Sequence, residues 1–157
     1  MSFESALKLA LDEVLKKSVE AWATNKYGKR FPIFSTVEHI DYSQIYEYRN
    51  YTKKEDVDIE ISIDNVEWYG IKKDGIVVSF YGLKIYGDKA RFKGSYTLKD
   101  YRKQGCLQSL IEHAKKTAKE RGCKTMNLFC TELSKNIHLR NGAVQEGKKE
   151  NFLVYYL

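Results

Sequence analysis

The chain has 157 residues, of which 43% are hydrophobic and 31% charged, and it carries a formal net charge of +6. With ten glycines and one proline, this composition excludes a disordered, collagen-like or low-complexity chain, and the length suits one domain over residues 1–157. No apolar run is long enough to span a membrane, and charged residues interrupt the N-terminal segment where an export signal needs an apolar core. We therefore expect a cytoplasmic protein that does not bind membranes.

The first third of the chain combines helical and extended patterns. Apolar residues recur at helical spacing over 3–23 and predict an amphipathic helix. Residues 33–40 suit either a short strand or the start of a helix, and the tyrosine-rich residues 41–50 predict a helix. Residues 57–63 alternate valine or isoleucine with polar residues, which is the pattern of a half-buried strand.

Three antiparallel strands are predicted in the middle of the chain. Two apolar runs, over 66–72 and 76–84, flank the Asp74-Gly75 pair, and this pair between such runs indicates a hairpin turn. A second turn at Gly87-Asp88 precedes a third strand over 89–98. These strands should therefore be neighbours in one sheet.

The last third alternates helices and strands. A helix over 105–121 is followed by a strand over 124–130, a short helix over 132–141 and final strands at Val144 and 152–157. No internal repeat or flexible linker divides the chain. The order of elements predicts one α/β (α+β) domain in which helices flank a mixed sheet.

Charge and cysteine usage limit the expected partners and cofactors. Residues 84–149 hold 16 Lys and Arg against 6 Asp and Glu, whereas the rest of the chain holds 11 basic and 15 acidic residues. A basic half indicates an anionic partner, such as a nucleotide or a nucleic acid, or else a solvated basic helix face. Because the three cysteines form no CxxC pair and the three histidines no HxxxH pair, we expect no metal site and no disulfide framework.

One turn between a strand and a helix carries a candidate binding pattern. The N–H groups of a helix N-terminus attract anions, and the helix predicted from residue 105 begins at a glycine that lets a ligand approach the backbone closely. Arg102 and Lys103 add two positive charges immediately before it. The turn is therefore a candidate diphosphate site, although an ordinary basic loop has the same composition.

The residues of this turn resemble a known family motif. The sequence Arg102-Lys103-Gln104-Gly105-Cys106-Leu107 resembles the acetyl-CoA motif Gln/Arg-x-x-Gly-x-Gly/Ala of the Gcn5-related N-acetyltransferase (GNAT) superfamily, with Leu107 in place of a small residue. Residues 137–143 resemble the family's Tyr-x-x-x-Gly-Phe ending, with His138 at the Tyr position and Ala143 at the Phe position. The resemblance covers residues 66–157, so residues 1–65 would be a divergent N-terminal, helical and acceptor-side portion. It implies a three-layer sandwich with a mixed, mostly antiparallel sheet of six to seven strands.

The resemblance also implies an enzyme of the acyltransferase class. It would be an N-acetyltransferase that takes acetyl-CoA as its donor and transfers the acetyl group to a primary amine by direct attack in a ternary complex. The implied cofactor-binding residues are Tyr96, Thr97 and Leu98 for the pantetheine arm and acetyl carbonyl, and Arg102, Lys103, Gln104, Gly105, Cys106 and Leu107 for the diphosphate.

The proton-transfer groups are less well defined by the sequence. The resemblance implies His138, or a tyrosine near the C-terminus, as the acid that protonates the leaving thiolate. A water molecule could deprotonate the amine, and the carboxylates considered for this role are Glu67, Asp100 and Glu132.

Two other functions fit the same residues. The basic half and the tyrosine cluster fit a GNAT-like protein that modifies nucleic acid, similar to the phage Mom DNA-modification proteins. The residues at 107 and 138 fit a binding module that kept the fold and lost catalysis. The amine acceptor, which could be a small molecule or a protein, is not defined by the sequence, and either a monomer or a homodimer is expected.

Overall fold

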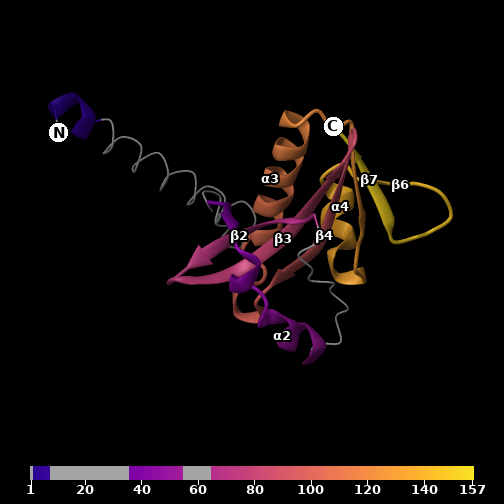
Figure 1. Ribbon diagram of the computed structural model, residues 1–157, viewed down its shortest axis with the longest axis horizontal. Coiled ribbons are helices and arrows are strands. Elements are labelled where there is room, and N and C mark those ends of the chain that lie inside the picture. The colour runs from indigo at the N-terminus through magenta and orange to yellow at the C-terminus, as the bar shows by residue number, and fades with distance from the viewer. Residues whose placement is uncertain (1, 8–35, 55–64) are drawn as a thin grey trace.

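A seven-stranded sheet organises the molecule. The computed structural model describes residues 2–7, 36–54 and 65–157, and the strand order in its sheet is β1-β2-β3-β4-β5-β7-β6 (Figure 1). The strands are β1 Glu38–Ile40, β2 Glu67–Lys73, β3 Ile76–Tyr86, β4 Lys89–Thr97, β5 Thr125–Phe129, β6 Val144–Gln145 and β7 Phe152–Tyr156. The helices are η1 Tyr42–Gln44, α2 Tyr48–Lys54, η2 Lys99–Tyr101, α3 Cys106–Glu120 and α4 Glu132–Arg140. Only β4 and β5 are parallel neighbours, so the predicted mixed, mostly antiparallel sheet is confirmed.

The central hairpins form as predicted. β2, β3 and β4 pair consecutively and antiparallel, and the turn between the first two is made by Asp74 and Gly75 at φ values of 53° and 79°. Two consecutive positive φ angles match the right-handed twist of the flanking strands, which explains why Asp-Gly is favoured there. Of the predicted helix over 3–23, residues 3–7 are helical and the rest lies outside the described residues, as does the predicted strand over 57–63.

The tyrosine-rich segment differs from its prediction. Instead of one helix over 41–50, the chain forms the short η1, a turn, and then α2 from Tyr48. The backbone N–H of Asp41, the N-cap of η1, donates to the side-chain oxygen of Gln44 at 2.8 Å, and this capping bond stabilises the short helix. The next residue, Ile45, lies in the turn between the two helices and is fully buried in a core shared with β1–β4. Residues 38–40 are a strand because they pair with β2.

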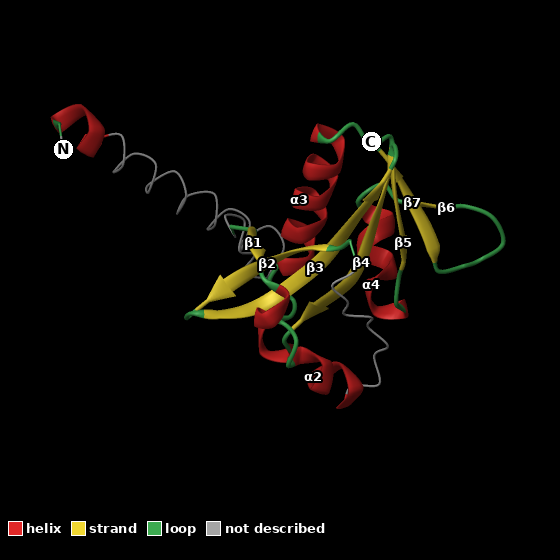
Figure 2. Ribbon diagram, in the orientation of Figure 1, coloured by secondary structure: helices red, strands yellow, loops and turns green. Residues whose placement is uncertain are grey.

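Helices cover both faces of the sheet (Figure 2). α3 buries Leu110, Ile111 and Ala114 against a large core that includes Phe92 of β4 and Leu153 of β7. α4 lies on this face too, since its Ile137 packs against the same core and Asn141, just after it, bonds to Gln108 of α3. On the opposite face, a smaller core gathers residues from β1–β4 and the segment before α2, namely Ile40, Ile45, Trp68, Val77, Phe80 and Tyr96. Among the described residues, no helix combines the length and apolarity that crossing a bilayer requires.

Candidate functional site

β4 and β5, in the middle of the sheet, are paired along only part of their length. They pair in parallel only at Lys89–Thr125, Ala90–Met126 and Arg91–Asn127, although β4 continues to Thr97 and β5 to Phe129. β4 also contains a bulge, since its pairing with β3 shifts between Gly82–Lys93 and Phe80–Tyr96. A bulge adds a residue to one strand and bends it, so β4 turns away from β5 beyond the last paired row. The result is a gap between the C-terminal ends of two adjacent parallel strands.

The candidate diphosphate turn lies directly after β4. Gly105 is the N-cap of α3 with a left-handed φ of 80°, and Lys103 adopts a φ of 61°. The first intrahelical bond joins the Ser109 N–H to the Gly105 carbonyl at 3.1 Å, so three N–H groups precede it at the helix end. No side chain caps them, and the first turn of α3 contains no acidic residue. The local geometry is therefore that of an anion-binding helix N-terminus.

Arg102 and the residues before it tie the turn to the sheet. The Arg102 Nε donates to the Thr97 carbonyl at 3.0 Å, and its guanidinium lies 5.5 Å from the centroid of the Tyr96 ring. The Thr97 hydroxyl shares a hydrogen bond of 2.7 Å with the buried hydroxyl of Ser79. The Leu98 N–H donates to the Val78 carbonyl at 2.8 Å. These contacts fix the direction in which the turn leaves β4.

The next residues of the motif face the core. Cys106 is buried, and burial raises the pKa of its thiol, which therefore stays protonated near neutral pH. Leu107 is half-buried and packs against the large core under α3. The two side chains thus anchor the start of the helix, while the backbone N–H groups form its exposed end.

A lysine that the sequence analysis missed lies at the same turn. Lys73, the last residue of β2, donates from Nζ to the side-chain oxygen of Gln104 at 3.3 Å. The Gln104 Nε2 donates in turn to the Asp100 carbonyl at 3.3 Å. Lys73 is 31 residues away in sequence, and only the antiparallel pairing of β2, β3 and β4 brings the hairpin tip to this end of the sheet.

His138 lies on α4, on the side of the helix that packs against the sheet. It is 1% exposed, its Nδ1 is 2.7 Å from the Tyr155 hydroxyl, and its ring meets the Phe92 ring edge-on at 5.6 Å. Burial lowers the pKa of His138 to about 4 and raises that of Tyr155, so both are uncharged near neutral pH. Phe92 is the β4 residue that follows the last row paired with β5. The histidine and a tyrosine near the C-terminus, the two candidate acids, are thus hydrogen-bonded to each other close to the gap.

α4 is held against the first turn of α3. The Asn141 Nδ2 donates to the Gln108 Oε1 at 2.8 Å and also to the Ile137 carbonyl within α4. The Asn141 carbonyl accepts a hydrogen bond from the Lys115 Nζ of α3 at 3.3 Å. Asn141 follows α4 by one residue and lies three residues after His138. This contact connects the candidate acid to the anion-binding end of α3.

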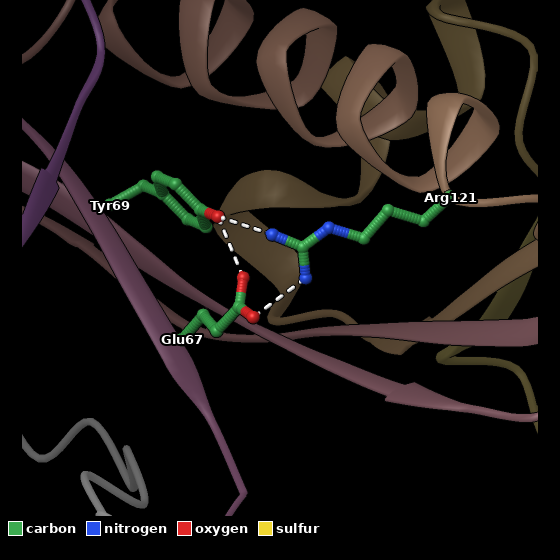
Figure 3. A network of polar contacts seen from close by, with 3 residues as sticks. All are labelled: Glu67, Tyr69 and Arg121. Carbon is green, nitrogen blue, oxygen red and sulfur yellow. Dashed lines mark hydrogen bonds and ion pairs between the residues drawn. The ribbon is translucent and has the colours of Figure 1, made fainter.

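Of the carboxylates considered as bases, Glu67 lies far from the anion-binding end of α3. Glu67 forms an ion pair of 2.6 Å with Arg121 and accepts a hydrogen bond of 2.7 Å from Tyr69, as Figure 3 shows. The Arg121 guanidinium lowers the pKa of Glu67. Arg121 is the C-cap of the 15-residue α3, so this network is about 20 Å from the anion-binding end. Asp100 lies in η2, within the candidate turn itself, and is exposed, as is Glu132 at the start of α4.

A metal site is not found among the residues that the structure describes, since none of their His, Cys, Asp and Glu side chains form a group of three able to hold an ion.

The sequence and the fold are both similar to those of known proteins. A family model described as the acetyltransferase (GNAT) family matches residues 17–141. No curated protein matches the chain. Among solved structures, an acetyltransferase of the GNAT family from Staphylococcus aureus Mu50 is similar with a TM-score of 0.62 and 13% identity, over 77% of this chain and 98% of that one.

Two further structures share the fold. A GNAT family acetyltransferase from Elizabethkingia anophelis, solved with acetyl-CoA bound, has a TM-score of 0.56 at 12% identity, over 78% of this chain and 97% of that one. The ribosomal-protein-S18-alanine N-acetyltransferase from Escherichia coli has a TM-score of 0.59 at 13% identity, over 76% and 90% of the two chains. At these identities the likeness establishes the architecture, and the family match over most of the chain establishes the relationship.

Proposed function

The chain belongs to the GNAT acetyltransferase family, and from this premise we propose that it is an N-acetyltransferase that uses acetyl-CoA to acetylate a primary amine. The observation that carries the proposal is the combination of the gap between β4 and β5 with the uncapped N-terminus of α3 beside it. The diphosphate of the donor would bind the N–H groups at Gly105 and beyond. Its pantetheine arm would enter the gap along Tyr96, Thr97 and Leu98.

The proposed reaction needs one bond to form and one to break. The amine nitrogen attacks the thioester carbonyl carbon, and collapse of the tetrahedral intermediate breaks the C–S bond. The amine loses a proton to water, and the leaving thiolate gains one. We assign this second step to the His138–Tyr155 pair, whose hydrogen bond is next to the gap. The Tyr155 hydroxyl carries its proton near neutral pH, which is the form that a proton donor requires.

Donor binding is the direct test of the proposal. Titration of the full chain with acetyl-CoA in a calorimeter should give one site per chain, and a saturating concentration should raise the unfolding temperature. Thiol release in the presence of amines should then identify the acceptor. A folded protein that binds no acetyl-CoA at millimolar concentration would contradict the proposal.

A non-catalytic binding module is the second candidate. It is favoured by the complete burial of His138 and by its low pKa, which leaves no imidazolium to donate a proton near pH 7. Such a protein would bind acetyl-CoA, yet none of a broad panel of amines would be acetylated. His138→Phe would then leave donor binding unchanged.

Lys73 should contribute to donor binding. Replacing it with glutamine is expected to weaken acetyl-CoA binding about 5-fold, because the ammonium group at Gln104 is lost from the end of the site that would hold the phosphates. Binding of S-acetylpantetheine, which lacks the nucleotide, should not change. Calorimetry measures both.

Lys72 provides a matched control for this prediction. It precedes Lys73 in β2, but its Nζ pairs with Glu38 of β1 at 2.8 Å. Lys72→Gln removes the same charge, and should alter acetyl-CoA affinity less than 2-fold because this ammonium group points to β1 rather than to the candidate turn. Equal losses in the two variants would show that Lys73 acts only through the overall charge.

A further inference from the structure

Half of one sheet face is left uncovered by the described helices. α3 and α4 cover the face that carries Phe92, Met126 and Tyr155, whereas the core under η1 and α2 covers β1–β3 and the end of β4 on the other face. The remaining part of that second face is formed by the end of β3, the start of β4, and β5 and β7. We call it the open face.

The register of the strands defines which side chains lie on the open face. Tyr86 pairs with Lys89, Lys89 with Thr125, and Thr125 with Tyr156, so these four form one row across the sheet. Two residues further along β4 and β5, Arg91 pairs with Asn127, and Phe129 pairs with Phe152. Residues directly opposite in neighbouring strands, and residues two apart in one strand, point to the same side. The open face therefore carries Tyr86, Lys89, Arg91, Phe129, Phe152 and Tyr156.

Its aromatic rings are exposed to an unusual degree. Tyr156 is 62% exposed, Phe129 57% and Tyr86 39%. The Phe129 and Phe152 rings lie 4.9 Å apart. Large aromatic side chains gathered on one exposed surface indicate a binding site, because single exposed rings are common but groups of them are not.

The charges on the open face are positive. The Arg91 guanidinium lies 5.4 Å from the Phe129 ring centroid, and the Lys149 ammonium, from the loop before β7, lies 5.8 Å from it. The Arg91 Nε also donates to Asn127 at 2.8 Å, and Asn127 donates to the Tyr86 hydroxyl at 2.7 Å. None of the strand positions on this face is a carboxylate; the nearest in sequence, Asp88 and Glu150, lie in turns.

We propose that the open face binds single-stranded nucleic acid. Proteins that bind single strands combine cations that follow the phosphates with aromatic rings on which bases stack, and both are present here. An acidic peptide would satisfy the cations but would leave Phe129 and Tyr156 without a partner. In a nucleic acid, the bases can stack on the aromatic rings and the phosphates can pair with the cations. The proposal concerns binding and does not depend on the transfer reaction.

The position of Phe129 relates this face to the gap. Phe129 lies on the part of β5 that no longer pairs with β4, two residues beyond the last paired row. A single-stranded nucleic acid with a base stacked on Phe129 would therefore pass beside the opening between β4 and β5. An amine carried by that nucleic acid could then reach the proposed donor, which would define the acceptor class of the proposed enzyme.

Fluorescence anisotropy with a labelled oligouridylate of about 15 nucleotides tests the proposal on the full chain. Affinity should fall about 20- to 50-fold between 50 and 200 mM salt if three or four phosphates are neutralised. Phe129→Ala should weaken binding at least about 5-fold through lost stacking, and Phe129→Tyr should restore it. The matched control is Leu133→Ala, because Leu133 is 84% exposed but lies on α4.

Each other result overturns the proposal. These results are the absence of binding at 50 mM salt, equal binding by Phe129→Ala and the natural chain, and equal competition by polyglutamate. A homodimer that Phe129→Ala dissociates would assign the open face to a second copy of the chain. Acetyl-CoA titration of the same samples separates this failure from failure of the proposed function, since loss of donor binding would affect only the latter.

Discussion

Gly105→Val is expected to weaken acetyl-CoA binding by at least about 30-fold, equivalent to about 2 kcal/mol. The glycine has a φ of 80°, a left-handed conformation that a β-branched residue adopts only with strain. The turn would relax by rotating the peptide groups at the start of α3, and their N–H groups would no longer point together at the diphosphate. Calorimetric titration of the variant with acetyl-CoA measures the loss.

Gly122→Val is the matched control for this experiment. Gly122 follows the C-terminal end of the same helix with a φ of 82°, and nothing lies within 4 Å of an added Cβ. Backbone strain is therefore introduced in both variants, and both should lose stability in urea. Only Gly105→Val should lose donor affinity. Similar affinity losses in the two variants would mean that strain, and not the anion site, is responsible.

A second large effect is expected in the pH dependence of stability. The free energy of unfolding should fall by about 2 kcal/mol between pH 7.5 and pH 5.0 because of His138 alone. Its pKa is about 4 in the folded protein and about 6.5 in the unfolded chain, so the unfolded chain binds more protons between these values. Stability is therefore complete above about pH 6.5 and is lost as the pH falls towards 4.

Urea unfolding of His138→Gln at the two pH values tests this effect. The variant should be less stable at pH 7.5, because Tyr155 loses its side-chain partner, but its stability should change about 2 kcal/mol less between the two conditions. His39→Gln is the control for the loss of a histidine, since His39 is exposed on β1 and its ring contacts Tyr69 rather than Tyr155. Identical pH dependence in the natural chain and His138→Gln would refute the assignment.

Local patterns were sufficient to predict most of the sheet and its longest described helix. The Asp74-Gly75 turn specifies its own hairpin, and the helical spacing of Leu110, Ile111 and Ala114 specifies the face of α3 that is buried. The tyrosine-rich segment was predicted only in part: η1 and the start of α2 are helical, but the turn between them was not predicted. Ile45 of this turn packs into a core formed with distant strands, and helical spacing contains no information about those strands.

The candidate site was only partly predictable for the same reason. Gly105 and its neighbours are contiguous, so their pattern is visible in the sequence. The contact of Lys73 with Gln104 depends on two hairpin registers, and that of His138 with Tyr155 depends on the packing of α4 over β7. Glu67 was a reasonable candidate base until the fold placed it beside Arg121, at the opposite end of α3.

The early separation of β4 from β5 creates two additional edges inside the sheet. Beyond Arg91 and Asn127 these strands no longer bond to each other, so each presents main-chain groups in the way that an outermost strand does. An outermost strand can recruit any extended chain that supplies amides of its own. A bound molecule with an amide-containing arm could hydrogen-bond to both strands and so bridge the two halves of the sheet. Without it, the two halves are joined by three rows of paired residues and by α3.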